Sequence, residues 1–266
     1  HADAALDGLR NVTDAETYTR WYETPRGRWI GVPELALLLG ELQPGPGQSL
    51  LDVGCGTGFF TRALASATGG PVTGVDVNPE WVAYARRQGT GKASYEVADA
   101  RALPYEAASF DLVVSIAALC FIEGERGAVR EMVRVAGRRV AIGLLNRHSL
   151  LWFREGRRGG RGGYRGARWH TPREAADLFT GLPVRLHRVQ TAIHLPGGGR
   201  LARIMERLWP RWVHTGAFIL VVADKVATSD EPPDNNMQRT ALRAAAGAER
   251  QITEQYRQGG HSCPRI

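Results

Sequence analysis

Short apolar runs that end in glycine or a polar residue alternate along the chain with segments of helical apolar spacing. Five such runs are typical of buried parallel strands, at residues 49–53, 71–77, 93–99, 110–115 and 139–145. Between the first two, Phe60, Ala63, Leu64 and Ala67 share one helix face. Strands that alternate with helices predict a mostly parallel α/β sheet covered by helices on both faces.

The segments that flank these runs continue the pattern. The spacing of Leu35, Leu38, Leu39 and Leu42 predicts a helix with one apolar face in the N-terminal segment. Further elements are expected at residues 171–178 (helix), 184–190 (strand) and 218–223 (strand), with a helical stripe between the last two. We therefore divide the chain into an N-terminal segment (1–47), one domain (48–226) with an insertion at about 146–214, and a polar linker with a helical tail (227–266).

Composition and charge narrow the class of protein. The 266 residues are 43% hydrophobic and 23% charged, as in ordinary globular domains, and three scattered cysteines do not form a disulfide framework. No apolar run approaches the roughly 20 residues that cross a bilayer, and no secretory signal is recognisable. We therefore expect a cytoplasmic protein without a transmembrane segment.

The net charge of +7 is concentrated in one place. Residues 154–168, from Arg154 to Arg168, hold six arginines and one acid, Glu155, which accounts for +5 of that charge. This Arg-Gly segment has three interpretations: a nucleic-acid contact, a cover over the substrate site that attracts an anionic substrate or surface, or a solvated loop. Since only Tyr164 and Trp169 interleave as aromatics, we favour a solvated or covering loop.

The sharpest feature is the glycine loop, residues 54–58, which follows the first strand and precedes a helix. Gly54, Gly56 and Gly58 allow a tight turn and close approach of a ligand at the carboxyl end of the strand. The spacing is neither G-x-G-x-x-G, which holds a pyrophosphate, nor a phosphate loop with lysine. The acid before the loop, Asp52, favours a positively charged ligand. Asp76, at the end of the second strand, has the position of an acid that binds ribose hydroxyls.

At this point a resemblance becomes clear. DVGCGTG at 52–58, GVDV at 74–77 and VADARALPYEAASFDLVVS at 97–115 resemble the class I S-adenosylmethionine-dependent methyltransferases. The similarity is greatest to the small-molecule group that includes the ubiquinone and menaquinone biosynthesis methylases, and it covers about residues 18–225. It implies a doubly wound, mainly parallel seven-stranded sheet with a reversed last strand. It also implies methyl transfer from S-adenosylmethionine to a small-molecule carbon, oxygen or nitrogen, leaving S-adenosylhomocysteine.

The resemblance also assigns residues to the cofactor. The loop would hold its methionine part, the second-strand acid its ribose, and the third-strand acid its adenine, with Tyr18 closing over it from a lid helix. The residues so implied are Tyr18, Asp52, Gly54, Cys55, Gly56, Gly58, Asp76, Val77, Asp99, Ala100 and Ser115.

No catalytic constellation accompanies this set. Cys55 is interpreted as a small residue in a tight loop rather than a nucleophile, and the histidines lack metal-ligand spacing, so no metal is expected. His148 and His170 are the candidates for a base that faces the acceptor.

Methyl transfer needs a base only when the acceptor must lose a proton, so positioning is expected to do most of the catalysis. The alternatives are a nucleic-acid methylase that uses the Arg-Gly segment, and a cofactor-binding scaffold without turnover. The acceptor and the oligomeric state are left open by the sequence.

Overall fold

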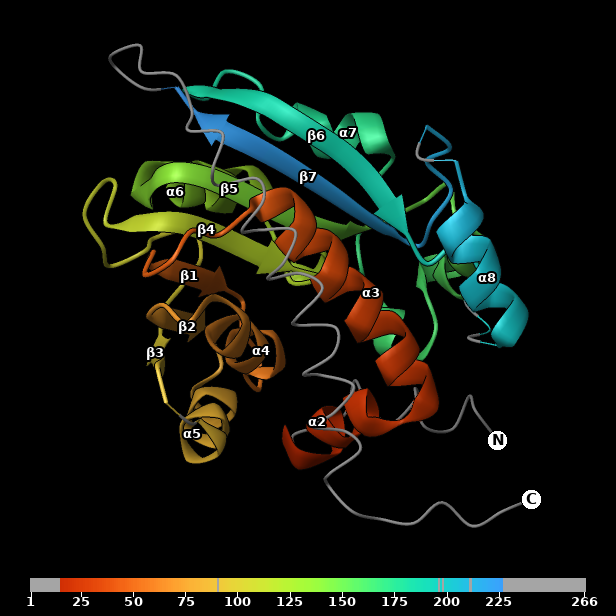
Figure 1. Ribbon diagram of the computed structural model, residues 1–266, viewed down its shortest axis with the longest axis horizontal. Coiled ribbons are helices and arrows are strands. Elements are labelled where there is room, and N and C mark those ends of the chain that lie inside the picture. Colours follow the sequence, from red (N-terminus) through yellow and green to blue (C-terminus); the bar gives the residue numbers. More distant parts are fainter. Residues whose placement is uncertain (1–14, 90, 196, 198, 211, 227–266) are drawn as a thin grey trace.

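The computed structural model describes residues 15–89, 91–195, 197, 199–210 and 212–226. The expected linker and helical tail lie outside the described residues, as do the first fourteen residues of the N-terminal segment. Figure 1 shows an α/β fold in which one twisted sheet passes through the molecule.

The described strands form one sheet of seven, in the order β3-β2-β1-β4-β5-β7-β6. Their bounds are β1 (Leu50–Val53), β2 (Val72–Asp76), β3 (Ala93–Val97), β4 (Phe110–Ile116), β5 (Ala136–Leu145), β6 (Val184–Ala192) and β7 (Phe218–Lys225). Strands β1 to β5 pair in parallel, whereas β7 runs antiparallel between β5 and β6. The predicted sheet and its reversed last strand are thereby confirmed.

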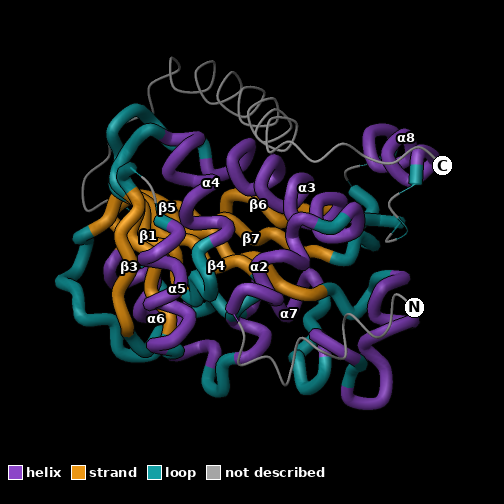
Figure 2. The backbone as a smooth tube through the Cα atoms, turned by 90° about the horizontal axis from the view of Figure 1, so that it is seen from below, coloured by secondary structure: helices purple, strands orange, loops and turns teal. Residues whose placement is uncertain are grey.

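Helices cover both faces of this sheet (Figure 2). Their bounds are α2 (Ala15–Glu23), α3 (Pro25–Leu42), α4 (Phe59–Thr68), α5 (Pro79–Gln88), α6 (Glu125–Val135), α7 (Pro172–Asp177) and α8 (Arg200–Leu208). The leucines of α3 and the buried face of α4 pack on one side of the sheet, and α6 and α7 pack on the other. Both faces of the central strands are buried, which is why their sequences are continuous apolar runs.

Local chemistry explains where the helices next to the ligand loops begin. Helix α5 starts at Pro79, and the Asn78 side chain accepts hydrogen bonds from the backbone N–H groups of Glu80 (2.9 Å) and Trp81 (3.3 Å). In α3 the side chain of Thr24 caps Gly27 in the same way. These caps fix the directions in which the chain leaves β2 and α2.

The start of β5 is the boundary that differs most from the expectation. Helix α6 ends at Val135 and β5 begins at Ala136, three residues earlier than the apolar run at 139 suggested. Ala136 pairs with Phe110, and the register then shifts between Phe110 and Leu112. The strand thus extends directly from the end of the helix.

Candidate functional site

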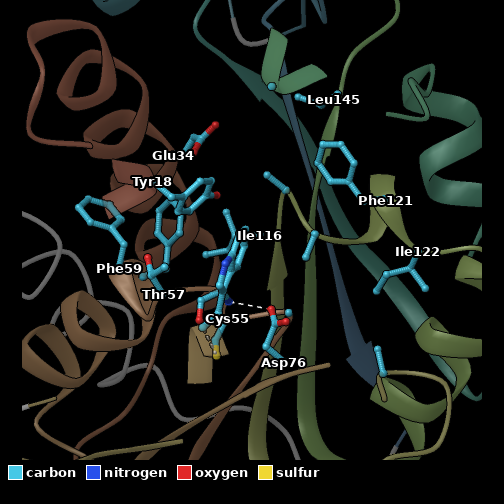
Figure 3. A pocket seen from close by; sticks show the side chains of 18 of the residues that line it. Tyr18, Glu34, Cys55, Thr57, Phe59, Asp76, Ile116, Phe121, Ile122 and Leu145 are labelled. Carbon is cyan, nitrogen blue, oxygen red and sulfur yellow. Dashed lines mark hydrogen bonds between the residues drawn. The ribbon is translucent and has the colours of Figure 1, made fainter. Parts of the chain in front are cut away.

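The glycine loop forms one wall of a pocket of about 890 Å³ at the carboxyl ends of β1, β2 and β4 (Figure 3). Gly54 has φ +77° and Gly56 has φ +55°, the left-handed region that glycine tolerates. A Cβ atom on Gly54 would lie 2.3 Å from Cβ of Ala118, so no larger residue fits there. The loop therefore needs glycine at this position both for its turn and for its packing.

Asp76 ties the loop to the second strand. Its carboxylate accepts one hydrogen bond from Gly56 N at 2.8 Å and another from Asn78 N at 2.9 Å; Figure 3 shows the first as a dashed line. The side chain is half-buried and lines the pocket. The structure thus brings a carboxylate, oriented by two backbone donors, to the place where the sequence predicts a ribose-binding acid.

The third-strand acid lies on the same wall and is held by its neighbour. Asp99 accepts hydrogen bonds from Arg101 Nε at 3.0 Å and Nη2 at 2.7 Å and from the Arg101 backbone N at 2.8 Å. These bonds lower the pKa of Asp99 to about 2. Val77 and Ala100 line the pocket beside it, and the Val77 side chain is 69% exposed. An apolar side chain left open within the pocket fits the flat face of an adenine ring.

Three of the predicted cofactor residues do not line the pocket. Asp52 is buried beneath the loop, where its carboxylate accepts a hydrogen bond from Thr61 Oγ1 at 2.7 Å, and burial raises its pKa to about 7. Gly58 is the N-cap of α4 and faces the Tyr95 ring.

Ser115 is fully buried on the opposite side of the strand. Strand β4 alternates, so Val113 and Ser115 face α6 whereas Ile116 reaches the pocket. The expectation that Ser115 is one of the cofactor residues is corrected by this alternation, because its side chain does not reach the pocket.

Helix α2 lies over the glycine loop. The Tyr18 ring stacks on Trp81 at 4.9 Å between centroids, and the Tyr22 ring stacks on Phe59 at 4.0 Å. Thr19 Oγ1 donates a hydrogen bond to Thr57 Oγ1 of the loop at 2.9 Å. These contacts attach helix α2 to the glycine loop and to the helices α4 and α5 that flank it. Tyr18 lines the pocket, as the sequence suggests.

The opposite end of the pocket is built from segments that are far apart in the chain. Its lining comes from α3, the ends of β5 and β6, and the Arg-Gly segment, with Ile30, Glu34, Leu145, Leu151, Tyr164 and Ile193 among its residues. We call this the acceptor end, and the end with Asp76 the cofactor end. None of these six residues was predicted. For Glu34 a signal existed, since this acid shares a helix face with the buried Ile30 and Leu38.

The proposed histidine bases are not in the pocket. His148 is exposed after β5, and His170 is buried with its Nε2 3.1 Å from Glu125 Oε2. Glu125 also accepts a hydrogen bond from Nη1 of the exposed Arg168 at 2.9 Å, so His170 belongs to a cluster that is separate from the pocket. The suggestion that either histidine faces the acceptor is therefore wrong, because neither borders the pocket.

The Arg-Gly segment presents two surfaces. Its arginines are exposed, whereas Gly163, Tyr164 and Arg165 line the pocket and Trp169 is buried. Its aromatic side chains therefore point inward and contribute to the acceptor end. This agrees with the interpretation as a covering loop.

The described residues show neither a reactive thiol in the pocket nor a cluster of metal ligands. Cys55 lines the pocket, but burial raises the pKa of its thiol well above the usual value. No three His, Cys, Asp or Glu side chains gather as a metal site would require, within the part of the chain that the structure describes. None of the described helices is both long and apolar enough to cross a membrane.

The chain is similar to known proteins in sequence and in fold. The family described as "Methyltransferase domain" matches residues 51–139. An uncharacterized protein of Mycobacterium tuberculosis is 30% identical over 229 residues, covering 84% of this chain and 75% of that protein. An O-methyltransferase of Pyrenophora dematioidea is 36% identical over 112 residues, which cover 40% of this chain and 42% of that enzyme.

Among solved structures, a Thermotoga maritima protein is similar in fold. It is described as a SAM-dependent methyltransferase, possible histamine N-methyltransferase, and matches with a TM-score of 0.63 and 22% identity over 84% of this chain and 99% of that one.

Proposed function

The chain belongs to the class I S-adenosylmethionine-dependent methyltransferases, and from this premise we propose that it methylates a small, largely apolar molecule bound at the acceptor end. The observation that carries the proposal is a single pocket whose lining joins the glycine loop and Asp76 to a chamber of aromatic and aliphatic side chains. Its volume is at the upper end of the roughly 300–1,000 Å³ usual for small-molecule sites. Such a pocket has room for a cofactor and a modest acceptor together.

For the cofactor we propose the residues of the cofactor end. Asp76 would take the ribose hydroxyls, Val77 and Ala100 would flank the adenine, Asp99 would accept from its amino group, and the loop backbone would hold the methionine part. Apart from Glu34, the described charged residues that line the pocket are three acids and two arginines, a balance that favours a cationic ligand. S-adenosylmethionine supplies, when bound, a methyl group made electrophilic by its sulfonium.

The chain itself would act by positioning and by excluding water. The Tyr18–Trp81 and Tyr22–Phe59 stacks hold α2 across the loop and so limit solvent access to the junction of the two ends. Removing water and aligning donor and acceptor supply much of the rate in a reaction of this kind. The segment of the pocket lined by Tyr164 would close the acceptor end from the other side.

A small-molecule acceptor is supported over nucleic acid. The Arg-Gly segment buries Trp169 and turns Tyr164 into the pocket, so neither ring is available as a surface stacking platform. Its exposed arginines remain able to attract an anionic surface. A cytoplasmic location stays a prediction from the sequence.

Calorimetric titration of S-adenosylhomocysteine tests the proposal, with NADH as the control ligand. We expect micromolar binding by the natural protein, no binding of NADH, and at least tenfold weaker binding by Asp76→Ala. Labelled methyl transfer to a cell extract should then persist after nuclease treatment and appear in the small-molecule fraction. Absence of cofactor binding in a folded protein contradicts the proposal, and labelling that nuclease removes supports the nucleic-acid alternative.

A further inference from the structure

A buried carboxyl group lies at the acceptor end, and nothing described so far uses it. Glu34 is in the middle of α3, is 6% exposed and lines the pocket, with Ile30 and Leu38 buried one turn to either side. In Figure 3 Glu34 lies in the upper part of the view next to Tyr18, and Asp76 lies in the lower part. Glu34 is therefore placed toward the acceptor rather than toward the ribose side of the cofactor.

Glu34 has no hydrogen-bond or ion-pair partner among the described residues. Two other glutamates whose ionisation burial opposes are different: the buried Glu125 is bonded to His170 and Arg168, and the half-buried Glu206 accepts from the backbone N–H groups of Ile193 and His194. Burial opposes the ionisation of both, but these bonds lower the pKa of each below its usual value. For Glu34, burial acts alone and raises the pKa to about 8.

A carboxyl group without a partner is costly to bury unless something else supplies a hydrogen bond. Because Glu34 borders the pocket, the partner that compensates this cost would come from the molecule that fills the pocket. Buried titratable groups of this kind in a cleft are more often found at functional sites than elsewhere.

The titratable groups around Glu34 are not suited to accept a proton, which makes Glu34 the proton acceptor of this cluster. Its charge acts on Tyr18 and Tyr22 of α2, on Tyr164 of the Arg-Gly segment and on Cys120 after β4. The pKa values of the three phenols and of this thiol are all raised by burial, so these groups stay protonated near neutral pH. A carboxyl that titrates near neutrality is suited to take and release a proton.

Resting on the proposed function, we propose that Glu34 binds the acceptor and receives the proton from its nucleophilic atom. The acceptor is accordingly a small, largely apolar molecule with a hydroxyl or amine group, and it is methylated on that oxygen or nitrogen rather than on carbon. Glu34 is thereby the residue that sets the acceptor class.

The transfer balances with the groups named. The acceptor oxygen or nitrogen forms a bond to the methyl carbon while the bond from that carbon to the sulfonium sulfur breaks and leaves its electron pair on sulfur. The proton of the hydroxyl or amine goes to the Glu34 carboxylate. The products are the methylated acceptor, neutral S-adenosylhomocysteine and a protonated Glu34, which loses its proton to solvent when the pocket opens.

The test follows the Glu34 carboxyl by ¹³C NMR in protein labelled at glutamate carboxyls and saturated with S-adenosylhomocysteine. Glu34→Gln identifies its signal, and Glu23→Gln, at an exposed position of α2, is the matched control. Phenol and benzylamine are the polar probes, and toluene is the apolar control. We expect the titration midpoint of the Glu34 signal to lie at least two pH units above that of exposed glutamates. Phenol or benzylamine should shift this midpoint by one pH unit or more, whereas toluene should not shift it.

The Glu34→Gln variant distinguishes the role of Glu34 in acceptor binding from the proposed methyltransferase function. Glu34→Gln should bind S-adenosylhomocysteine within threefold of the natural protein but bind the responding probe at least tenfold more weakly, with Glu23→Gln unchanged in both. The role of Glu34 is overturned if its titration midpoint equals that of exposed glutamates. It is also overturned if neither polar probe shifts the midpoint more than toluene does. Loss of S-adenosylhomocysteine binding in Glu34→Gln overturns it too. Failure of the natural protein to bind S-adenosylhomocysteine instead overturns the proposed function itself.

Discussion

The two ends of the pocket are built in different ways. At the cofactor end, charged side chains meet nearby partners: Asp76 accepts from Gly56 and Asn78, and Asp99 is clamped by Arg101. At the acceptor end the ionisable group, Glu34, is buried without a described partner, among side chains from distant parts of the chain. The first end is thus organised before any ligand arrives, whereas the second leaves a hydrogen-bonding requirement for its ligand to meet.

The two ends also differ in whether local sequence or tertiary packing determines their geometry. The cofactor end is made by turns that directly follow strands, so a short stretch of sequence carries its geometry. The acceptor end depends on how α3, the Arg-Gly segment and the last strands pack together. Specificity for the acceptor therefore resides in tertiary contacts on a scaffold that many functions share.

The largest expected effect is at the acceptor end and concerns stability. Because burial holds the pKa of Glu34 near 8, its protonated form stabilises the fold fully below about pH 4.5, and this contribution is lost as the pH rises through 8. Relative to Glu34→Gln, the natural protein should lose up to about 4–5 kcal/mol across that window, from the shift in pKa. Urea unfolding at several pH values measures the difference, and a difference that does not change with pH contradicts an unpartnered buried carboxyl.

Next in size is the backbone of the cofactor end. In Gly54→Ala the added Cβ meets Ala118 and the residue must keep a positive φ, so we expect a loss of about 1–3 kcal/mol in stability and at least thirtyfold weaker S-adenosylhomocysteine binding. Gly47→Ala is the matched control, because Gly47 has φ +75° with no atom near its Cβ position. The control should lose about 1 kcal/mol and bind normally. Equal binding by both variants would show that the close approach to Ala118 is unimportant.

A smaller effect is expected where α2 meets the loop. Trp81→Leu removes the stack on Tyr18, a contact worth about 0.5–1.5 kcal/mol, and should weaken S-adenosylhomocysteine binding by up to tenfold. Amide hydrogen exchange within α2 should become faster. Tyr84→Leu, on the same helix but away from the pocket, should change neither quantity; unaltered exchange in Trp81→Leu would argue that other contacts hold the lid.

The smallest effect is expected at the rim of the cofactor end. Arg101 lowers the pKa of Asp99, and this favourable interaction is present above pH 4 and disappears as the pH falls through about 2. Arg101→Gln should return the titration of Asp99 toward its usual range while changing S-adenosylhomocysteine binding at pH 7 by less than threefold. An ITC measurement showing a tenfold loss would mean that Arg101 contacts the ligand directly.

The outcome for individual residues shows what could be predicted. Gly54, Gly56, Asp76, Val77, Asp99 and Ala100 were found on the pocket wall because strand ends and the loops that follow them meet at one edge of a parallel sheet. Ser115 was misplaced, since the two faces of β4 are both apolar in sequence and only the docking of α2 and α3 decides which face the pocket occupies. His148 and His170 were misplaced for a similar reason, because their positions after β5 did not reveal the buried contact of His170 with Glu125.

The sequence by itself predicted strands that alternate with helices, and a glycine loop with acids at strand ends, because these follow from local apolar periodicity and from residues at fixed spacing. The seven-stranded sheet and the class of cofactor were implied by the family resemblance that these motifs carry. The tertiary structure alone decided that Glu34 is enclosed without a partner and that Tyr164 turns inward from a basic segment. The physical reason is that burial and desolvation are properties of contacts between distant segments. A carboxyl group in a helix has an ordinary pKa until the rest of the chain removes its water.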